Sequence, residues 1–316
     1  MSRDATGIVI VVLTLMAIGI VMVYSASAIY ADQVVGSSSY YLVRQAVFSI
    51  IGLLCMLGFS LIDPLFLKRH SRLIMLIGLV LLAAVYAPFI SQTTRNTKRW
   101  LHLFGLNLQP AEFSKIALCI YFSDYLSRNM KPIVQGKILV FFPPLFILLL
   151  YSGLILVQPD LGTVVILFSV SAVLFFLSGL RQRYIWVFFL ICSSIAYFAI
   201  IKVPYRMRRI IAYLDPWSDP LGSGFQIIQS FLALASGGLQ GVGLGQSTQK
   251  LFYLPQSYTD FIFSIIGEEL GFMGSAFVTL LFLLFLIFGI RIANRQHDLF
   301  KKYLAVSLVL LVIIQA

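Results

Sequence analysis

The chain has 316 residues, of which 60% are hydrophobic and only 11% charged, with a mean hydropathy of +0.96 and a formal net charge of +11. This composition excludes an ordinary soluble domain, whose surface carries far more charge. It predicts an all-α, polytopic membrane protein that forms one integral membrane domain over residues 1–316. The three cysteines lie in apolar stretches without CxxC spacing, so we expect neither disulfides nor a zinc site.

Apolar stretches of roughly 20 residues recur along the chain, and each is long enough to cross a bilayer as a helix. They predict eight transmembrane helices plus a partial ninth, and the first is expected to be a retained helix rather than a signal peptide. The ninth stretch has only 14 residues, so we expect the sequence to be truncated there. The predicted spans lie near residues 7–29, 44–62, 72–90, 109–127, 138–157, 162–180, 184–201, 261–290 and 303–316.

Basic residues favour one orientation in the membrane. With the N-terminus in the cytoplasm, 13 Lys and Arg residues fall on the cytoplasmic side and 9 on the outer side, in agreement with the positive-inside rule. Seven of the 9 outer cations nevertheless gather at residues 95–100 and 202–209. Cations placed against the insertion bias suggest an anionic partner on the outer face; contact with phospholipid headgroups is the alternative. The favoured anion-binding candidates are Lys98, Arg99, Arg206, Arg208 and Arg209.

A large extracytoplasmic loop over residues 202–260 separates the seventh and eighth predicted helices. Its apolar run 225–235 has 11 residues, too short to span, and predicts a re-entrant or interfacial helix with Gln226 and Gln229 on one side. Asp215 and Asp219 each precede a proline, which is more typical of turns than of metal ligands. The glycines that follow match no nucleotide-binding motif, but they allow the backbone to approach a ligand or a neighbouring helix closely.

Three carboxylates stand near the start of the eighth apolar run. Charges beside bilayer hydrocarbon are costly and usually mark function. Asp260 fits a helix N-cap or a catalytic base, and one residue can serve as both. Glu268 and Glu269 would point about 80° and 180° away from Asp260 on a helix. At least one of them must therefore face another helix.

A second charged group lies in the fourth predicted span. Glu112 and Lys115 are three residues apart, adjacent on one helical face, and are expected to pair inside the membrane. They form either a closed structural ion pair or, together with Asp260, the lining of one polar cavity that opens to the outer face. The three histidines do not gather with carboxylates in the sequence, so we predict no preformed metal site.

Six motifs in this order carry a resemblance that runs over some 180 residues. They read NTKRW, LQPAEFSK, QPDLGT, DPWSDPLGSGFQIIQS, SGGLQGVGLGQSTQKL and YLPQSYTDFIFSIIGEELGF. Together they resemble the SEDS family of shape, elongation, division and sporulation proteins, and the glycine-rich part is more similar to its cell-division branch than to its rod-elongation branch. The sequence departs from the family in having Asn96-Thr97 where Asn-Gly is usual, and in lacking the region that follows the ninth helix.

The resemblance implies a ten-helix peptidoglycan glycosyltransferase in the bacterial inner membrane. Such a protein polymerises lipid II during septal cell-wall synthesis, beside a class B penicillin-binding transpeptidase, other divisome membrane proteins and membrane lipid, without nucleic acid. The family's essential external aspartate corresponds to Asp260, its membrane Glu and Lys to Glu112 and Lys115, and its functionally important tryptophan to Trp100. No cofactor is firmly implied, although Mg²⁺ or Mn²⁺ bridging a carboxylate and the diphosphate is left open.

The expected reaction is an inverting transfer with Asp260 as general base, and with Glu112 and Lys115 in the same site. Two other functions compete with it. A lipid II flippase or transporter would also need many helices and a charged cavity, but the sequence shows no internal repeat, and its polar groups gather on one face. A non-enzymatic divisome scaffold for a transpeptidase is the other. The predicted substrate-binding residues are Lys98, Arg99, Trp100, Arg206, Arg208, Arg209, Gln226 and Gln229.

Overall fold

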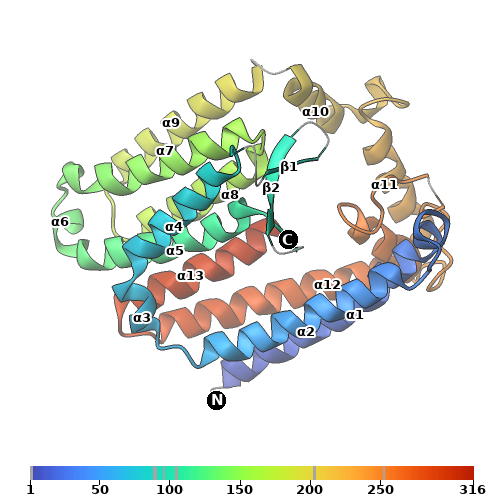
Figure 1. The fold of residues 1–316 in the computed structure, drawn as a ribbon, viewed down its shortest axis with the longest axis horizontal. Helices are drawn as coiled ribbons and strands as arrows, with labels where there is room; N and C mark the ends of the chain where they lie inside the picture. Colours follow the sequence, from blue (N-terminus) through green and yellow to red (C-terminus); the bar gives the residue numbers. More distant parts are fainter. Residues whose placement is uncertain (1–2, 88–90, 95–96, 104–105, 202–203, 252) are drawn as a thin grey trace. The chain divides into compact units, whose positions relative to one another are not determined.

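The computed structural model describes residues 3–87, 91–94, 97–103, 106–201, 204–251 and 253–316 (Figure 1). Within the predicted membrane domain it distinguishes two compact units. Unit 1 comprises Met1–Leu61 and Ile195–Phe285, and unit 2 comprises Ile62–Ser194 and Leu286–Ala316. The boundary between them falls inside two of the helices, α9 and α12. Each unit is described by itself.

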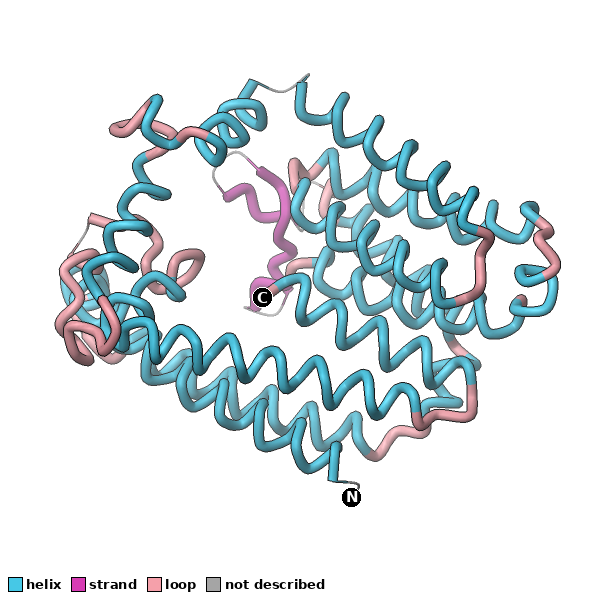
Figure 2. Tube along the Cα trace, turned by 180° about the vertical axis from the view of Figure 1, so that it is seen from behind, coloured by secondary structure: helices cyan, strands magenta, loops and turns pink. Residues whose placement is uncertain are grey.

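Helices make up most of the described chain, and each of the nine predicted spans contains one. They form the cyan tube of Figure 2. The short helices α3, α6, η1 and η2 lie in the connections between longer ones. The helices are α1 (Arg3–Val35), α2 (Tyr40–Ser60), α3 (Pro64–Arg69), α4 (Ser71–Ala84), α5 (Pro110–Arg128), α6 (Met130–Val134), η1 (Ile138–Phe141), α7 (Phe142–Val157), α8 (Leu161–Leu177), α9 (Gln182–Ile201), α10 (Pro204–Leu214), η2 (Pro216–Ser218), α11 (Phe225–Gly237), α12 (Ile262–Asn294) and α13 (Leu299–Gln315).

Four helical segments in the described residues are long and apolar enough to cross a membrane. They are α1, α2, the combined segment Ile138–Val157, and α12. Shorter apolar helices include α4, α8 and α11. Because large apolar side chains remain exposed along these helices, their outer surfaces suit lipid rather than water. The helical membrane architecture therefore agrees with the prediction from hydropathy.

In unit 1, α1 and α2 form a helical hairpin whose arms lie side by side (Figures 1 and 2). The core of the unit joins α1 to the first part of α12. Met22 and Ala26 of α1 pack with Ile265, Ile266 and Val278 of α12, and Leu254 from the preceding loop joins the same cluster. This loop is therefore part of the packed structure.

Unit 2 is a helical bundle centred on α5, which contacts α4, α7, α8 and α13 (Figure 1). Buried positions occur around the whole circumference of α5, as expected for a helix surrounded by neighbours. Small residues allow close approach, since a Cβ placed on Gly78 of α4 would lie 3.2 Å from the Cβ of Ala117. The Tyr151 hydroxyl of α7 donates to the carbonyl of Met75 in α4. Polar as well as apolar contacts thus join these helices.

A small sheet precedes α5. The all-α prediction did not include this sheet. Strands β1 (Ser91–Thr94), β2 (Thr97–Leu103) and β3 (Leu106–Leu108) form an antiparallel sheet in the order β1-β2-β3. Leu101 in β2 is buried and pairs with Leu108. Lys98 and Arg99 therefore lie on strand β2 rather than in a plain loop.

Candidate functional site

Asp260 is exposed and lies in the turn just before α12 begins. The loop that carries it is anchored at two points. Leu254 is buried in the core of unit 1, and the ring of Tyr258 packs 5.2 Å from Tyr30 and 4.7 Å from Tyr41, measured between centroids. Burial raises the pKa of Tyr258, and its contact with the Tyr41 hydroxyl acts in the same direction. Tyr258 is thus a neutral packing residue that fixes the approach to Asp260.

Glu269 takes part in a buried ion pair. Its Oε1 lies 2.7 Å from the Nζ of Lys250, and both of its carboxylate oxygens accept from the Ser25 hydroxyl, at 2.8 and 2.6 Å. Glu269 is 1% exposed and Lys250 5%. Because Ser25 belongs to α1, the prediction that one of the two glutamates turns toward another helix is confirmed.

Glu268 is equally buried but is satisfied by neutral donors. Its Oε1 accepts from the backbone N–H of Thr248 at 2.9 Å and from the Thr248 hydroxyl at 3.0 Å, and its Oε2 accepts from the Ser247 hydroxyl. Residues 247–250 are therefore fastened to α12 through both glutamates. We call Glu268, Glu269, Lys250, Ser25, Ser247 and Thr248 the carboxylate clasp.

The backbone of α12 opens beside the clasp. Gly271 has φ 67° and ψ −165°, which interrupts the helix. The N–H groups of Val242 and Gly243 donate to the carbonyls of Glu268 and Glu269 at 3.0 and 3.1 Å. A Cβ at Gly241, which has φ 81°, would lie only 2.2 Å from the Glu269 carbonyl oxygen, so only glycine fits there. The expected close approach of the glycine-rich segment to a neighbouring helix is thus confirmed.

A cationic pocket lies in the same unit, with a volume of about 510 Å³. Arg208 and Arg209 of α10 and Gln226 of α11 line it, and Pro255 contributes from the loop that carries Asp260. Its remaining lining residues are Leu221, Gly222, Ser223 and Phe225. Arg206 and Gln229 lie on the same two helices but are outside this lining. The structure therefore brings together some of the predicted anion-binding residues.

The turn between α10 and α11 shapes one wall of this pocket. Asp215 immediately precedes η2, and the carboxylate of Asp219 accepts from the N–H and the hydroxyl of Ser223 at 2.8 and 2.9 Å. These hydrogen bonds from Ser223, with a smaller contribution from Arg208, lower the pKa of Asp219. Both aspartates are therefore turn-formers, as their prolines predict.

The lowered pKa of Asp219 makes the stability of this turn depend on pH. A carboxylate with a lowered folded-state pKa stabilises the fold fully above its ordinary pKa, and this contribution is lost as the pH falls through the lowered value. We expect Asp219→Asn to reduce the thermal stability slightly at neutral pH and not at all in strong acid. Thermal unfolding in detergent across that range measures the difference, with Asp32→Asn as an exposed control. A difference that persists in acid would contradict this assignment.

In unit 2, Glu112 and Lys115 form the predicted ion pair. Lys115 Nζ lies 2.9 and 2.8 Å from the two carboxylate oxygens of Glu112, and it also donates to the Gln315 side chain of α13 at 2.8 Å. Lys115 is 1% exposed, whereas the Glu112 side chain is 51% exposed. The pairing is confirmed. Asp260 belongs to the other unit, so a cavity shared with it stays a prediction.

Strand β2 carries the remaining predicted residues. Arg99 donates from Nε to the carbonyl of Gln158 at 2.7 Å and from Nη2 to that of Pro159 at 2.6 Å, so its guanidinium holds the turn between α7 and α8. Trp100 is half-buried and pairs with Gln92 across the sheet. The side chain of Lys98, like Asn96, lies outside the described residues. Substrate binding by Lys98, Arg99 and Trp100 stays a prediction.

Lys250 is the residue that sequence reasoning missed. Of the outer cations, only Arg44 and Lys250 lie outside the two basic clusters. A buried carboxylate needs a cation or several hydrogen-bond donors. Lys250, which lies outside both basic clusters and close in sequence to Glu268 and Glu269, could therefore have indicated the buried ion pair. Among the described residues, no group of three or more His, Cys, Asp or Glu side chains that could hold a metal ion occurs.

The chain is similar to known proteins over nearly its whole length. A family model that covers FtsW, RodA and SpoVE, described as cell cycle protein, matches residues 5–316. Stage V sporulation protein E of Bacillus subtilis is 40% identical over 308 residues, which cover 98% of this chain and 84% of the relative. The probable peptidoglycan glycosyltransferase FtsW of Geobacter metallireducens is 38% identical over 309 residues, covering 98% and 82%.

Solved structures share the fold. A chain from a study of how a peptidoglycan synthase complex coordinates polymerization and crosslinking matches with a TM-score of 0.76 at 28% identity, covering 96% of this chain and 82% of that one. The Thermus thermophilus rod shape determining protein RodA matches with a TM-score of 0.67 at 22% identity, covering 96% and 80%. The predicted polytopic helical membrane fold is thereby confirmed.

Proposed function

Because the chain belongs to the FtsW/RodA/SpoVE family of cell cycle proteins, the SEDS family, we propose that it is a glycosyltransferase that polymerises lipid II into peptidoglycan strands. Relatives named as peptidoglycan glycosyltransferases support this activity. The single observation that carries the proposal is a loop in unit 1. Pro255 on this loop lines the cationic pocket, and Asp260 follows five residues later. Even a fully extended chain would place these two residues no more than about 18 Å apart.

In the proposed reaction, Asp260 acts as the general base. It accepts the proton of the acceptor sugar's 4-hydroxyl as that oxygen bonds to the anomeric carbon of the donor. The bond between this carbon and the diphosphate oxygen breaks on the opposite face, so the configuration inverts. A positioned base typically contributes about 10²–10⁴-fold to the rate. The exposure of Asp260 suits direct contact with a substrate, and the anchors at Leu254 and Tyr258 suit a fixed position.

The cationic pocket supplies the second requirement of the reaction. Undecaprenyl diphosphate gains negative charge as it departs, and guanidinium groups stabilise such charge through paired, charge-assisted hydrogen bonds. Arg208 and Arg209 line the pocket, and Gln226 adds an amide. Arg206 and Gln229 are proposed to extend this surface.

The residues of unit 2 are proposed to contact the same substrate. The paired Glu112 and Lys115 stay in the proposed site, Lys98 and Arg99 would add positive charge, and the half-buried Trp100 offers an aromatic face to a sugar ring. The family relation supports these roles.

A crosslinking partner fits this activity. One of the similar structures belongs to a peptidoglycan synthase complex that coordinates polymerization and crosslinking, which supports a class B penicillin-binding transpeptidase as the partner of this chain. Relatives named FtsW favour a septal role, together with other divisome membrane proteins. The proposed location is the inner membrane, with the N-terminus in the cytoplasm, as the distribution of basic residues indicates.

Polymerisation of labelled lipid II by the purified protein in detergent tests the proposal, with and without the transpeptidase. We expect Arg208→Gln/Arg209→Gln to lower kcat/KM by on the order of 10²-fold, because each variant position loses hydrogen bonds to a charged group. Arg44→Gln is the matched control, since Arg44 is an exposed arginine of the same unit that does not line the pocket.

The detergent assay, combined with a transport assay in vesicles, separates the two competing functions. Detergent requires no flipping, so a chain that moves lipid II across vesicle membranes yet makes no glycan is a flippase or transporter. A chain that binds the transpeptidase but is inactive with it is a scaffold. If charge reversal at Arg208 and Arg209 spares lipid II turnover and abolishes transpeptidase binding, the cluster is an interface and the proposed diphosphate site is wrong.

A further inference from the structure

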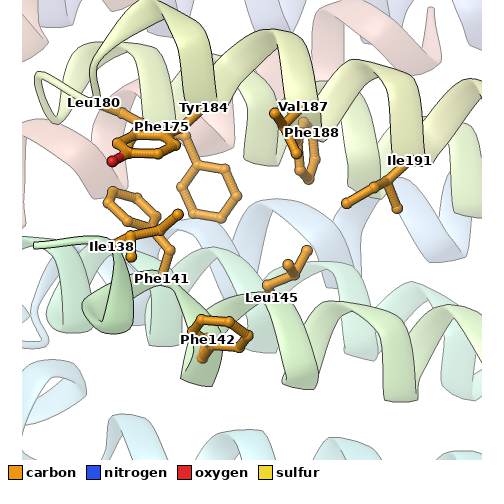
Figure 3. A pocket seen from close by; sticks show the side chains of 10 residues that line it. All are labelled: Ile138, Phe141, Phe142, Leu145, Phe175, Leu180, Tyr184, Val187, Phe188 and Ile191. Atoms are coloured by element: carbon orange, nitrogen blue, oxygen red, sulfur yellow. The ribbon is translucent and has the colours of Figure 1, made fainter.

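A second pocket, of about 200 Å³, lies in unit 2 (Figure 3). Its residues come from η1, α7, the end of α8, the turn after α8, and α9, and their side chains point toward a common space (Figure 3). Tyr184 alone among them carries a polar side chain, and its hydroxyl accepts a hydrogen bond from Arg183 at 2.7 Å. The lining residues are Ile138, Phe141, Phe142, Leu145, Phe175, Leu180, Tyr184, Val187, Phe188 and Ile191.

Two helical stripes face one another across this space. Residues 138, 141, 142 and 145 follow helical spacing on η1 and α7, and residues 184, 187, 188 and 191 repeat that spacing on α9. Apolar cavities of this size stay dry and bind apolar molecules, and an unfilled hollow forfeits dispersion contacts along its lining. In a bilayer, the acyl chains of lipids are the apolar groups available to occupy the pocket.

Three basic residues adjoin lining residues in the chain, and we call them the rim of the pocket. Lys137 precedes Ile138, and Arg181 and Arg183 flank the start of α9; all three are exposed. Arg181 donates to the carbonyl of Gln135 at 3.4 Å, and a Cβ at Gly136 would lie 2.5 Å from its guanidinium carbon. Arg181 therefore lies against the turn that carries Lys137, which concentrates positive charge at one end of the pocket.

No carboxylate offsets this charge locally in the sequence. Segments 125–159 and 161–214 contain no Asp or Glu, and both contribute to the pocket and its rim. An apolar cavity with a cationic rim is complementary to a molecule that joins a hydrocarbon chain to a phosphate. By the positive-inside rule, this rim belongs to the cytoplasmic leaflet.

We propose that this pocket binds an anionic phospholipid of the cytoplasmic leaflet, with one acyl chain between α7 and α9 and the phosphate at Lys137 and Arg181. The site is separate from glycosyl transfer and does not depend on the activity proposed above. It would hold α9 against α7 through a lipid chain. Binding should therefore require both the apolar lining and the charged rim.

Native mass spectrometry of the purified protein with dioleoyl-phosphatidylglycerol, and with the zwitterionic dioleoyl-phosphatidylcholine, tests this site. We expect the anionic lipid to be retained more tightly, and Lys137→Gln/Arg181→Gln to weaken its binding by roughly tenfold. Arg181→Lys should retain binding because it retains the charge. Lys301→Gln/Lys302→Gln is the control for a change in net charge.

A second pair of variants, both on α9, tests whether the pocket holds an acyl chain. Val187→Trp should fill the cavity and reduce retention of both lipids, whereas Leu190→Trp, at a 68% exposed position outside the lining, should not. Equal retention of the two lipids by the unmodified protein, or unchanged retention in Val187→Trp and in Lys137→Gln/Arg181→Gln, would overturn the proposal. Displacement of phosphatidylglycerol by an equal concentration of undecaprenyl phosphate would overturn the assignment to a phospholipid.

Discussion

Replacing Asp260 with Asn is expected to lower the rate of lipid II polymerisation by about 10²–10⁴-fold and to leave the protein folded. An amide retains the shape of the side chain but cannot accept the proton of a sugar hydroxyl at neutral pH. Asp260 is exposed, so the substitution leaves no buried charge without a partner. The measurement is the initial rate of glycan formation at saturating lipid II, compared with the thermal stability of the same preparation.

A matched carboxylate control is available in unit 1. Asp32, near the end of α1, is also exposed, and Asp32→Asn should retain full activity. Because a general base acts in the chemical step, Asp260→Asn should lower kcat much more than it raises KM. An Asp260→Asn protein that still polymerises lipid II at the unmodified rate would remove Asp260 from the mechanism, and the cationic pocket would then need another base nearby.

Hydropathy and local chemistry allowed much of this fold to be predicted. Each apolar stretch became a helix because a bilayer leaves the backbone few other ways to satisfy its hydrogen bonds. The pairing of Glu112 with Lys115 followed from a spacing of three residues on one helix. The turns at Asp215 and Asp219 followed from the prolines beside them. In all of these cases the determining interactions lie within a few residues of sequence.

The remaining features depend on contacts distant in sequence. Ser25 and Glu269 are separated by 244 positions, and no local pattern connects them. Gly271 opens α12 and admits residues 238–243, which form hydrogen bonds with the backbone on both sides of the break. The sheet before α5 was missed because β2, with the sequence TKRWLHL, shows no clean alternation of apolar and polar residues.

Removing the Glu269 carboxylate is expected to destabilise the protein by about 3–5 kcal/mol, because Glu269→Ala leaves the Lys250 ammonium buried without its partner. Lys250 is 5% exposed, so water cannot readily replace the carboxylate. Loss of the bond from Ser25 adds to this effect. The measurement is the free energy of unfolding in detergent. As a control, Lys68→Gln breaks the more exposed pair with Asp298, whose charged atoms are 3.6 Å apart, and should cost at most about 1 kcal/mol.

The double variant Lys250→Met/Glu269→Leu distinguishes a coupled pair from two independent residues. Replacing both charges with apolar groups leaves no charge of this pair unpaired, so the double variant should be more stable than Glu269→Ala. If the clasp also positions the loop that carries Asp260, the double variant should be more stable than Glu269→Ala but should still have a lower kcat than the unmodified protein. The reason is that Glu268 alone would then fasten residues 247–250. Strictly additive losses of stability would show that Lys250 and Glu269 do not act as a pair.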